Sequence, residues 1–352
     1  MGTTADKLNK LLETKANIKQ AIIDKGVDIP DDTKFADYPS KIADIASGND
    51  PLGPFYRQLT NNGTNYNYLF YYKTISDPSF IESLDTSNVT GMSYAFNNFS
   101  TSSSLDLSGW NVSKITNMNN MFASATIPEL DVTNWDTSEV TTMSSVFDAF
   151  KGSTITGLNT WNTGKVINMS QMFKGCKATS LNISNWDVSK VTNMTGMFGD
   201  CPNLTTLDIS GWDTSNVKEF GSIYWFLSGS SSSLLTTVIG ELDLSRCTAG
   251  MYYSTSYYCF KSLPKLETLY LKNIYKNSTM TNVVKWSINL GGTKVKDECL
   301  IYIINELPDL INDKGLTNTD KIVLTLPPTN TLTAEQVQVA VDKGWNVANT
   351  TY

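Results

Sequence analysis

Apolar residues recur along residues 81–217 with a period much longer than that of a single helix or strand. Successive tryptophans are 25 or 26 residues apart, at Trp110, Trp135, Trp161, Trp186 and Trp212. Phenylalanine and methionine repeat at the same step, at Phe96, Phe122, Phe147, Phe173 and Phe198 and at Met92, Met118, Met143, Met169 and Met194. A fixed period of this length is typical of repeat architectures, so the sequence predicts a stack of similar units.

Each unit divides into segments with different patterns, as in LNISNWDVSKVTNMTGMF at residues 181–198. The alternation Leu-x-Ile predicts a short strand with two apolar side chains facing inward. Asp or Asn follows each Trp, and Ser comes two residues later in four of five units, which predicts a turn that binds free backbone amides. Val191, Met194 and the pair Met197 and Phe198 have the spacing of one helix face, so a short helix is expected next.

A unit of this size cannot bury its own apolar side, so neighbouring units must complete the core, with strands ~4.8 Å apart. The expected fold class is α/β, a leucine-rich-repeat-like solenoid over residues 81–290, regular to 217 and degenerate afterwards. The aromatic and methionine columns suit either a core or a ligand site, and their identical filling in every unit favours the core. Cys176 and Cys201 occupy equivalent slots, as a buried thiol pair or a disulfide.

The outward strand positions form a polar column, the acidic column. Its members are Asp106, Asp131, Gly157, Asn182, Asp208 and, after a longer unit, Asp243. Carboxylates about 5 Å apart repel each other, so they can share a cation or receive a basic or hydroxyl-rich ligand. The alternative is that each Asp is solvated or binds the adjacent turn. We treat the Asp and Asn members as receptor-contact candidates and expect no cofactor, resident metal or catalytic residue.

The strings LDISGWDTSNV at 207–217 and VTNMTGMF at 191–198 resemble the BspA-type leucine-rich repeats of bacterial surface proteins, which also occur in phage structural proteins. The resemblance is close over residues 81–217 and fades through 275. It implies a curved solenoid used for adhesion or scaffolding, and it implies no catalysis.

Composition narrows the possible functions. With 27 basic and 34 acidic residues the net charge is −7, which disfavours nucleic-acid binding through a positive field. The chain has no histidine, which removes imidazole bases, Ser-His-Asp triads and histidine zinc sites, so no enzyme is expected. Paired carboxylates that cleave a glycan remain an alternative. Five cysteines without a CxxC pair indicate free thiols.

The first 48 residues predict an attachment or oligomerisation segment. Thr3 or Thr4 can cap an amphipathic helix that ends at Gly26. Its apolar stripe consists of Leu8, Leu11, Leu12, Ile18 and Ile22. This stripe either packs on its own domain or associates with partners. Residues 4–45 resemble the N-terminal segment of many phage tail, baseplate and fibre proteins, which implies attachment to a virion.

Two aromatic stretches and the C-terminal region complete the expected organisation. Residues 49–80 combine a linker with an aromatic N-terminal cap, whose tyrosines either cover the first repeat or contact a sugar. Tyr252, Tyr253, Tyr257 and Tyr258 lie in an irregular unit and are further receptor-contact candidates. Residues 291–352 predict an α/β cap, with a helix near 296–307, a strand at 322–326 and a Thr333-capped helix that ends at Gly344.

The N-terminus lacks the apolar core of a secretory signal, and the longest apolar run, 299–304, is too short to cross a bilayer. We therefore expect no membrane insertion and assembly in a host cytoplasm. The expected function is that of a structural virion protein of a tailed phage, a head or tail fibre or receptor-binding component. Expected partners are capsid or baseplate proteins, a host surface glycan or protein, and further copies in a homotrimer. The alternative is a bacterial cell-surface adhesin.

Overall fold

The computed structural model describes residues 14–19, 64–220, 227, 233–246, 263–276, 288–316 and 322–349. The chain divides into two units, Met1–Asn62 and Gly63–Tyr352. In the first unit residues 14–19 are helical, as the amphipathic pattern predicts, and Ile18 is half-buried. The other residues of that stripe, Leu8, Leu11, Leu12 and Ile22, lie outside the described residues.

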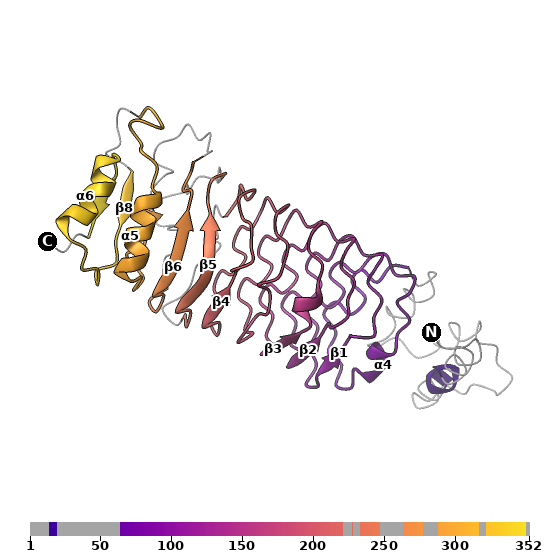
Figure 1. The fold of residues 1–352 in the computed structure, drawn as a ribbon. Helices are drawn as coiled ribbons and strands as arrows, with labels where there is room; N and C mark the ends of the chain where they lie inside the picture. The colour runs from indigo at the N-terminus through magenta and orange to yellow at the C-terminus, as the bar shows by residue number, and fades with distance from the viewer. Residues whose placement is uncertain are drawn as a thin grey trace. The chain divides into compact units, whose positions relative to one another are not determined.

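The unit Gly63–Tyr352 is a stack of coils whose strands run parallel (Figure 1). The expected solenoid is confirmed: Leu105 pairs with Leu130, and Leu130 with Ile155, in register. One sheet has the order β1-β2-β3 and a second the order β4-β5-β6. The strands are β1 (Leu105–Asp106), β2 (Glu129–Asp131), β3 (Thr154–Thr156), β4 (Thr206–Asp208), β5 (Thr237–Asp243) and β6 (Thr268–Lys272). Short helical turns are α4 (Ser79–Glu82) and η2 (Leu158–Thr160).

The helix expected in each repeat is wrong, because the segment that carries Met and Phe is a series of turns. Alternate amides in it bond to the next coil, as where Gln171 N–H donates to Thr195 O at 2.7 Å. Isolated parallel bridges, such as Asn168 to Asn193, continue this pairing along the stack. Packed helices need about 8–10 Å between axes, whereas paired strands repeat at ~4.8 Å. A coil that pairs with its neighbours on both sides has no room for a helix.

These turns are held by residues in the left-handed backbone region. The turn from Met92 to Ala95 closes with the Ala95 amide on Met92 O at 3.2 Å, and its third residue, Tyr94, has φ 59°. A positive φ at that place is the mark of a type II turn. Two columns of such residues run along the stack: Tyr68, Tyr94, Asn120, Ser145, Gln171 and Gly196, and Tyr72, Asn98, Ser124, Ala149, Gly175 and Asp200.

The aromatic columns form the core, which confirms the core interpretation of the repeat. Phe122 and Phe147 stack at 5.5 Å with an interplanar angle of 3°, and Trp161 and Trp186 stack at 6.1 Å with the same angle. The repeat phenylalanines, tryptophans and methionines are all buried. Continuous stacking of this kind adds specific ring contacts to the hydrophobic gain of burial.

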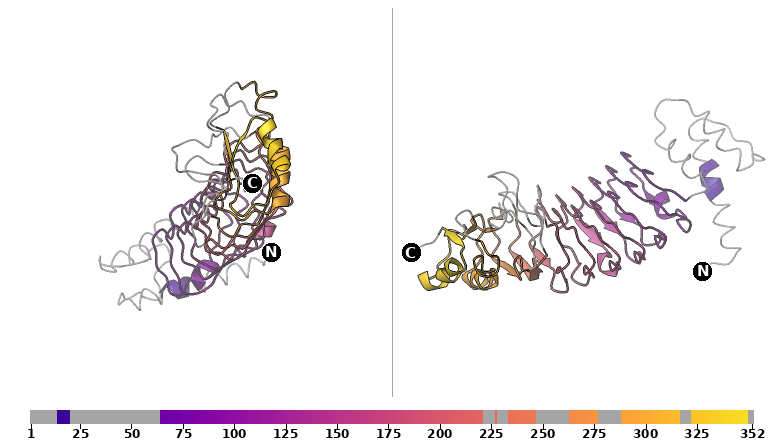
Figure 2. Two further views of the ribbon diagram at one scale, coloured as in Figure 1. Left: turned by 90° about the vertical axis from the view of Figure 1, so that its left-hand side faces the viewer. Right: turned by 90° about the horizontal axis from the view of Figure 1, so that it is seen from above.

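The C-terminal elements are the predicted ones, and they lie at the end of the stack away from β1 (Figure 2). They are α5 (Asp297–Glu306), α6 (Ala334–Asp342) and a parallel sheet of β7 (Ile288–Asn289), β8 (Val323–Thr325) and β9 (Asn346–Ala348). Thr333 caps α6 in a capping box with Gln336, and Gly344 follows with φ 83°. Trp345 is buried behind it and donates from Nε1 to Pro308 O at 3.1 Å.

Candidate functional site

The outer wall of the solenoid carries columns of polar side chains at the places where each coil turns. After the repeat Trp, the amide of Ser189 donates to Asp187 Oδ1 at 3.0 Å, and that of Ser215 donates to Asp213 Oδ1 at 3.0 Å. This confirms the predicted turn. The hydroxyl and the amide of the following Ser hold the pKa of Asp136, Asp187 and Asp213 below its ordinary value.

The first members of the acidic column lie side by side and are also used within turns. Asp106 and Asp131 are partners in the register of β1 and β2. Asp106 Oδ1 accepts the Ser108 amide at 2.9 Å, which lowers the pKa of Asp106, and Asp131 Oδ1 accepts the Thr133 amide at 2.8 Å. Binding to the adjacent turn, the alternative considered for these residues, is therefore present. Receptor contact by them stays a prediction.

The rest of the acidic column is less regular than the sequence suggested. Asp131 pairs with Thr156, so Gly157 does not continue the column. Asn182 is exposed, and the carboxylate of Asp208 accepts the Ser210 amide at 2.9 Å.

The placement of Asp243 in the acidic column is wrong, because Asp208 pairs with Ile239. The longer unit shifts register within β5, and Asp243 moves to the position that follows the repeat Trp. There its amide and carbonyl both bond to the hydroxyl of Thr214, at 2.7 and 3.2 Å. Asp243 is buried, and Asn273 Nδ2 donates to its Oδ2 at 2.7 Å.

The aromatic candidates divide between core and surface. Tyr66 and Phe70 are buried in the first described coil, while Tyr68, Tyr71 and Tyr72 are exposed, with Tyr68 stacked on Tyr94 at 4.9 Å. The first group caps the core, and the second remains available to a ligand. The later candidates, Tyr252, Tyr253, Tyr257 and Tyr258, lie outside the described residues.

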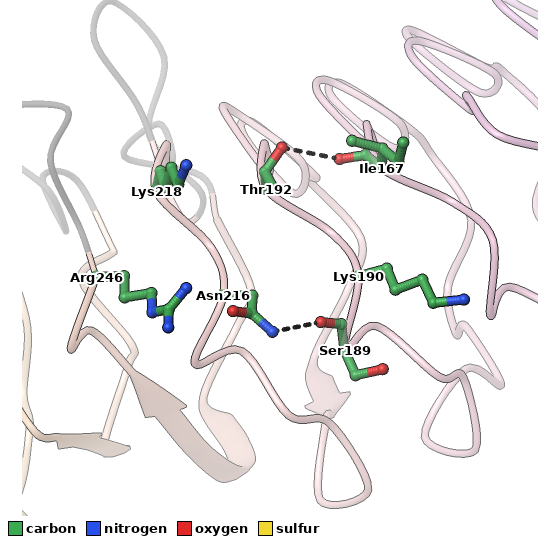
Figure 3. A pocket seen from close by; sticks show the side chains of 7 residues that line it. All are labelled: Ile167, Ser189, Lys190, Thr192, Asn216, Lys218 and Arg246. Atoms are coloured by element: carbon green, nitrogen blue, oxygen red, sulfur yellow. Dashed lines mark hydrogen bonds between the residues drawn. The ribbon is translucent and has the colours of Figure 1, made fainter.

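A hollow that the sequence analysis missed opens on the wall, with a volume of about 350 Å³ (Figure 3). Two rows of side chains line it, Lys190, Asn216 and Arg246 in one and Ile167, Thr192 and Lys218 in the other. In the repeat these residues directly precede or follow the conserved-period valines, such as Val191 and Val217. Comparing the variable positions beside those valines is the signal that would have found them.

Two searches of the described residues gave no candidate. Within the described ranges, no group of three or more His, Cys, Asp or Glu side chains is placed to hold a metal ion. No helix in that part of the chain combines the length and the apolar character needed to cross a membrane.

The fold and its polar wall define a repeat solenoid of parallel coils. The family described as "Mycoplasma protein of unknown function, DUF285" matches residues 58–157 and 146–232, which include most of the regular coils. This match and the solenoid fit a BspA-type repeat protein and are consistent with an adhesin-like surface protein. No curated protein and no solved structure gives a significant match.

Proposed function

We propose that the chain is a structural virion protein of a tailed phage, a fibre or receptor-binding component that displays the solenoid for adhesion to a host surface. The observation that carries the adhesive part is the stacked core. Phe122, Phe147 and Phe173 are each 0% exposed in one continuous column, so the rings serve packing and the outer wall is left for recognition. A long, regular wall suits a repetitive surface ligand.

The proposal includes no catalysis. A glycan-cleaving pair needs one carboxylic acid with a raised pKa in an apolar pocket. The pKa of Asp106 is instead lowered, because Ser108 donates to the ionised form. Release of reducing sugar from host capsule by the purified protein would favour a depolymerase over an adhesin.

The virion part of the proposal rests on the resemblance of residues 4–45 to phage attachment segments. We expect deletion of residues 1–26 to abolish incorporation into particles while the solenoid keeps its circular dichroism spectrum. Antibody labelling of purified particles, seen by negative-stain microscopy, measures this and also separates head from tail. Normal incorporation of the deleted chain would contradict attachment through this segment. A homotrimer is the proposed state, and light scattering of the purified chain tests it.

A bacterial cell-surface adhesin is the second candidate, and the family match favours it because that family is described from Mycoplasma. The two candidates differ in where the protein is found. Detection on the surface of uninfected cells would support the bacterial adhesin, whereas detection in purified particles alone would support the virion protein.

A further inference from the structure

The hollow lies across three successive coils of the wall. The bonds between Thr214 and Asp243 align Ser245 with Ser215 and Ser189, since each serine amide binds the Asp two residues before it. Lys190, Asn216 and Arg246 therefore occupy the same place in consecutive coils. Two coil spacings of ~4.8 Å put the backbones of Lys190 and Arg246 roughly 10 Å apart along the stack.

The three cations of the hollow are exposed and lack an ion-pair partner among the described residues. Lys190, Lys218 and Arg246 are exposed, in a chain whose net charge is −7. One coil earlier in the same column, Lys165 is paired with Glu139 at 2.7 Å. The hollow is thus a local positive site on an acidic protein.

Nearby carboxylates are held by other groups. Glu219 Oε2 accepts Asn193 Nδ2 at 2.6 Å, and Asp187 Oδ1 accepts the Ser189 hydroxyl at 2.6 Å. Lys190 helps to lower the pKa of Asp187, but less than Ser189 does. The cations consequently keep most of their capacity for an external anion.

Between the cations the lining includes apolar surface. Ile167 is 51% exposed, which is unusual for its type, and it lies beside Thr192, whose hydroxyl donates to Ile167 O at 3.4 Å (Figure 3). Asn216 Nδ2 donates to Ser189 O at 2.7 Å, which fixes the amide in the row between Lys190 and Arg246. Cations around a small apolar patch suit a ligand that has both charged groups and apolar ring faces.

We propose that this hollow binds an anionic polysaccharide laid along the stack. Its carboxylate or sulfate groups contact Lys190, Lys218 and Arg246, and a sugar ring rests on Ile167 and Thr192. A single-stranded nucleic acid fits less well, because the lining has no aromatic side chain on which bases stack. The inference deepens the proposed adhesive function and rests on it for the biological source of the ligand.

The experiment measures binding of defined polymers to the purified full-length chain by isothermal titration calorimetry. The probes are polygalacturonate, which carries carboxylates, dextran sulfate, and neutral dextran. We expect one or both anionic polymers to bind and dextran not to bind, and the two anionic arms identify the charged group. Substituting Lys190→Gln, Lys218→Gln and Arg246→Gln together should weaken binding at least about tenfold, since charge-assisted contacts are lost. Binding should also weaken as salt rises.

A matched variant separates the hollow from overall charge. Lys151→Gln, Lys165→Gln and Lys177→Gln remove the same charge from exposed lysines outside the hollow and should leave binding within about twofold. Equal loss in both variants, no binding of either anionic polymer, binding of dextran, or tighter binding of single-stranded DNA would each overturn the inference. Tryptophan fluorescence checks the fold of both variants. Such a failure leaves the proposed function standing, because adhesion is scored separately on cells and particles.

Discussion

Individual tryptophans tie each coil to the one before it. Trp186 Nε1 donates to Leu158 O at 2.8 Å, and Trp135 Nε1 donates to Leu107 O at 2.8 Å. Trp161 has the same stacked place, but its buried Nε1 has no hydrogen-bond partner in the described structure. Residues in one column therefore contribute unequally to stability, although the repeat makes them look identical.

Replacing these indoles by phenyl rings should reveal that inequality. Trp161→Phe and Trp186→Phe remove similar volume from the core, but only Trp186→Phe also removes a hydrogen bond. We expect Trp186→Phe to lower the free energy of unfolding by about 1 kcal/mol more than Trp161→Phe does. Urea unfolding followed by circular dichroism measures the difference. An equal loss in the two variants would show that the Trp186 bond contributes nothing net.

The thiols of Cys176 and Cys201 should be inert while the chain is folded. Burial raises the pKa of Cys176 to about 12, and burial followed by the neighbouring Cys176 raises that of Cys201. At pH 8 we expect no alkylation of either thiol by iodoacetamide in the native protein and full alkylation in urea, as read by mass spectrometry. Native labelling of either would contradict their burial.

The same shift sets the direction of a pH effect. Because the folded pKa of Cys176 lies above its ordinary value of 9.0, its contribution to stability is present below pH 9 and is lost as pH rises toward 12.

Residue columns were the part of the structure that the sequence predicted best. Identical Trp, Phe and Met positions have only one efficient use in a stack, so their burial followed directly, as did the adjacency of Cys176 and Cys201. The roles of Asp106 and Asp131 did not follow, because an outward carboxylate suits solvent, a turn or a ligand equally well. The hollow escaped prediction because its cations come from positions that vary between units.

At the level of elements, the turn segment shows why a correct pattern gave a wrong helix. Val191, Met194 and Phe198 face one side in both a helix and a series of type II turns, so their spacing does not separate the two. The hydrogen-bond partners decide, and those belong to the next coil: Phe173 N–H donates to Met197 O at 2.9 Å. Information from one unit alone cannot include this bond.

The left-handed columns give a direct test of the turns. Gly175 has φ 66°, and a Cβ there would meet its nearest atom at 3.5 Å, an ordinary contact. Gly175→Ala should therefore lower the free energy of unfolding by about 1–2 kcal/mol through backbone strain alone. Gly109→Ala is the matched control, because Gly109 has no atom within 4 Å of such a Cβ and no positive φ. It should be neutral or slightly stabilising in the same urea titration, and a neutral Gly175→Ala would contradict the turn assignment.

At the level of the whole molecule, the regular coils behave as interchangeable layers, whereas the later unit does not. Asp208 to its partner Ile239 spans a longer interval than the 25 or 26 residues between earlier partners, and β5 shifts register between Thr237 and Glu241. Sequence alignment of the strand motif therefore placed Asp243 on the wrong face. Where the period is strict, register is predictable, and where a unit lengthens, only the pairing itself determines it.

Removing one period should leave a folded, shorter stack. Deleting residues 166–190 joins Lys165 to Val191, which takes the place of Val166 in every column. We expect the variant to unfold cooperatively with a near-native circular dichroism spectrum and a lower free energy of unfolding, since nearest-neighbour contacts are lost. Deleting residues 166–178 breaks the period and should prevent folding. Equal behaviour of the two deletions would contradict translational stacking.

The alternate amides that join each turn segment to the next coil also determine how the molecule answers a pull along its stack. Their bonds, with those of the parallel strands, are the links between layers, and a single peptide continues the chain from one layer to the next. Detaching one layer frees about 25 residues, which extend to roughly 80–90 Å at about 3.3–3.6 Å per residue. A tether built this way lengthens in steps under load and holds its outermost contacts while the inner layers give way one at a time.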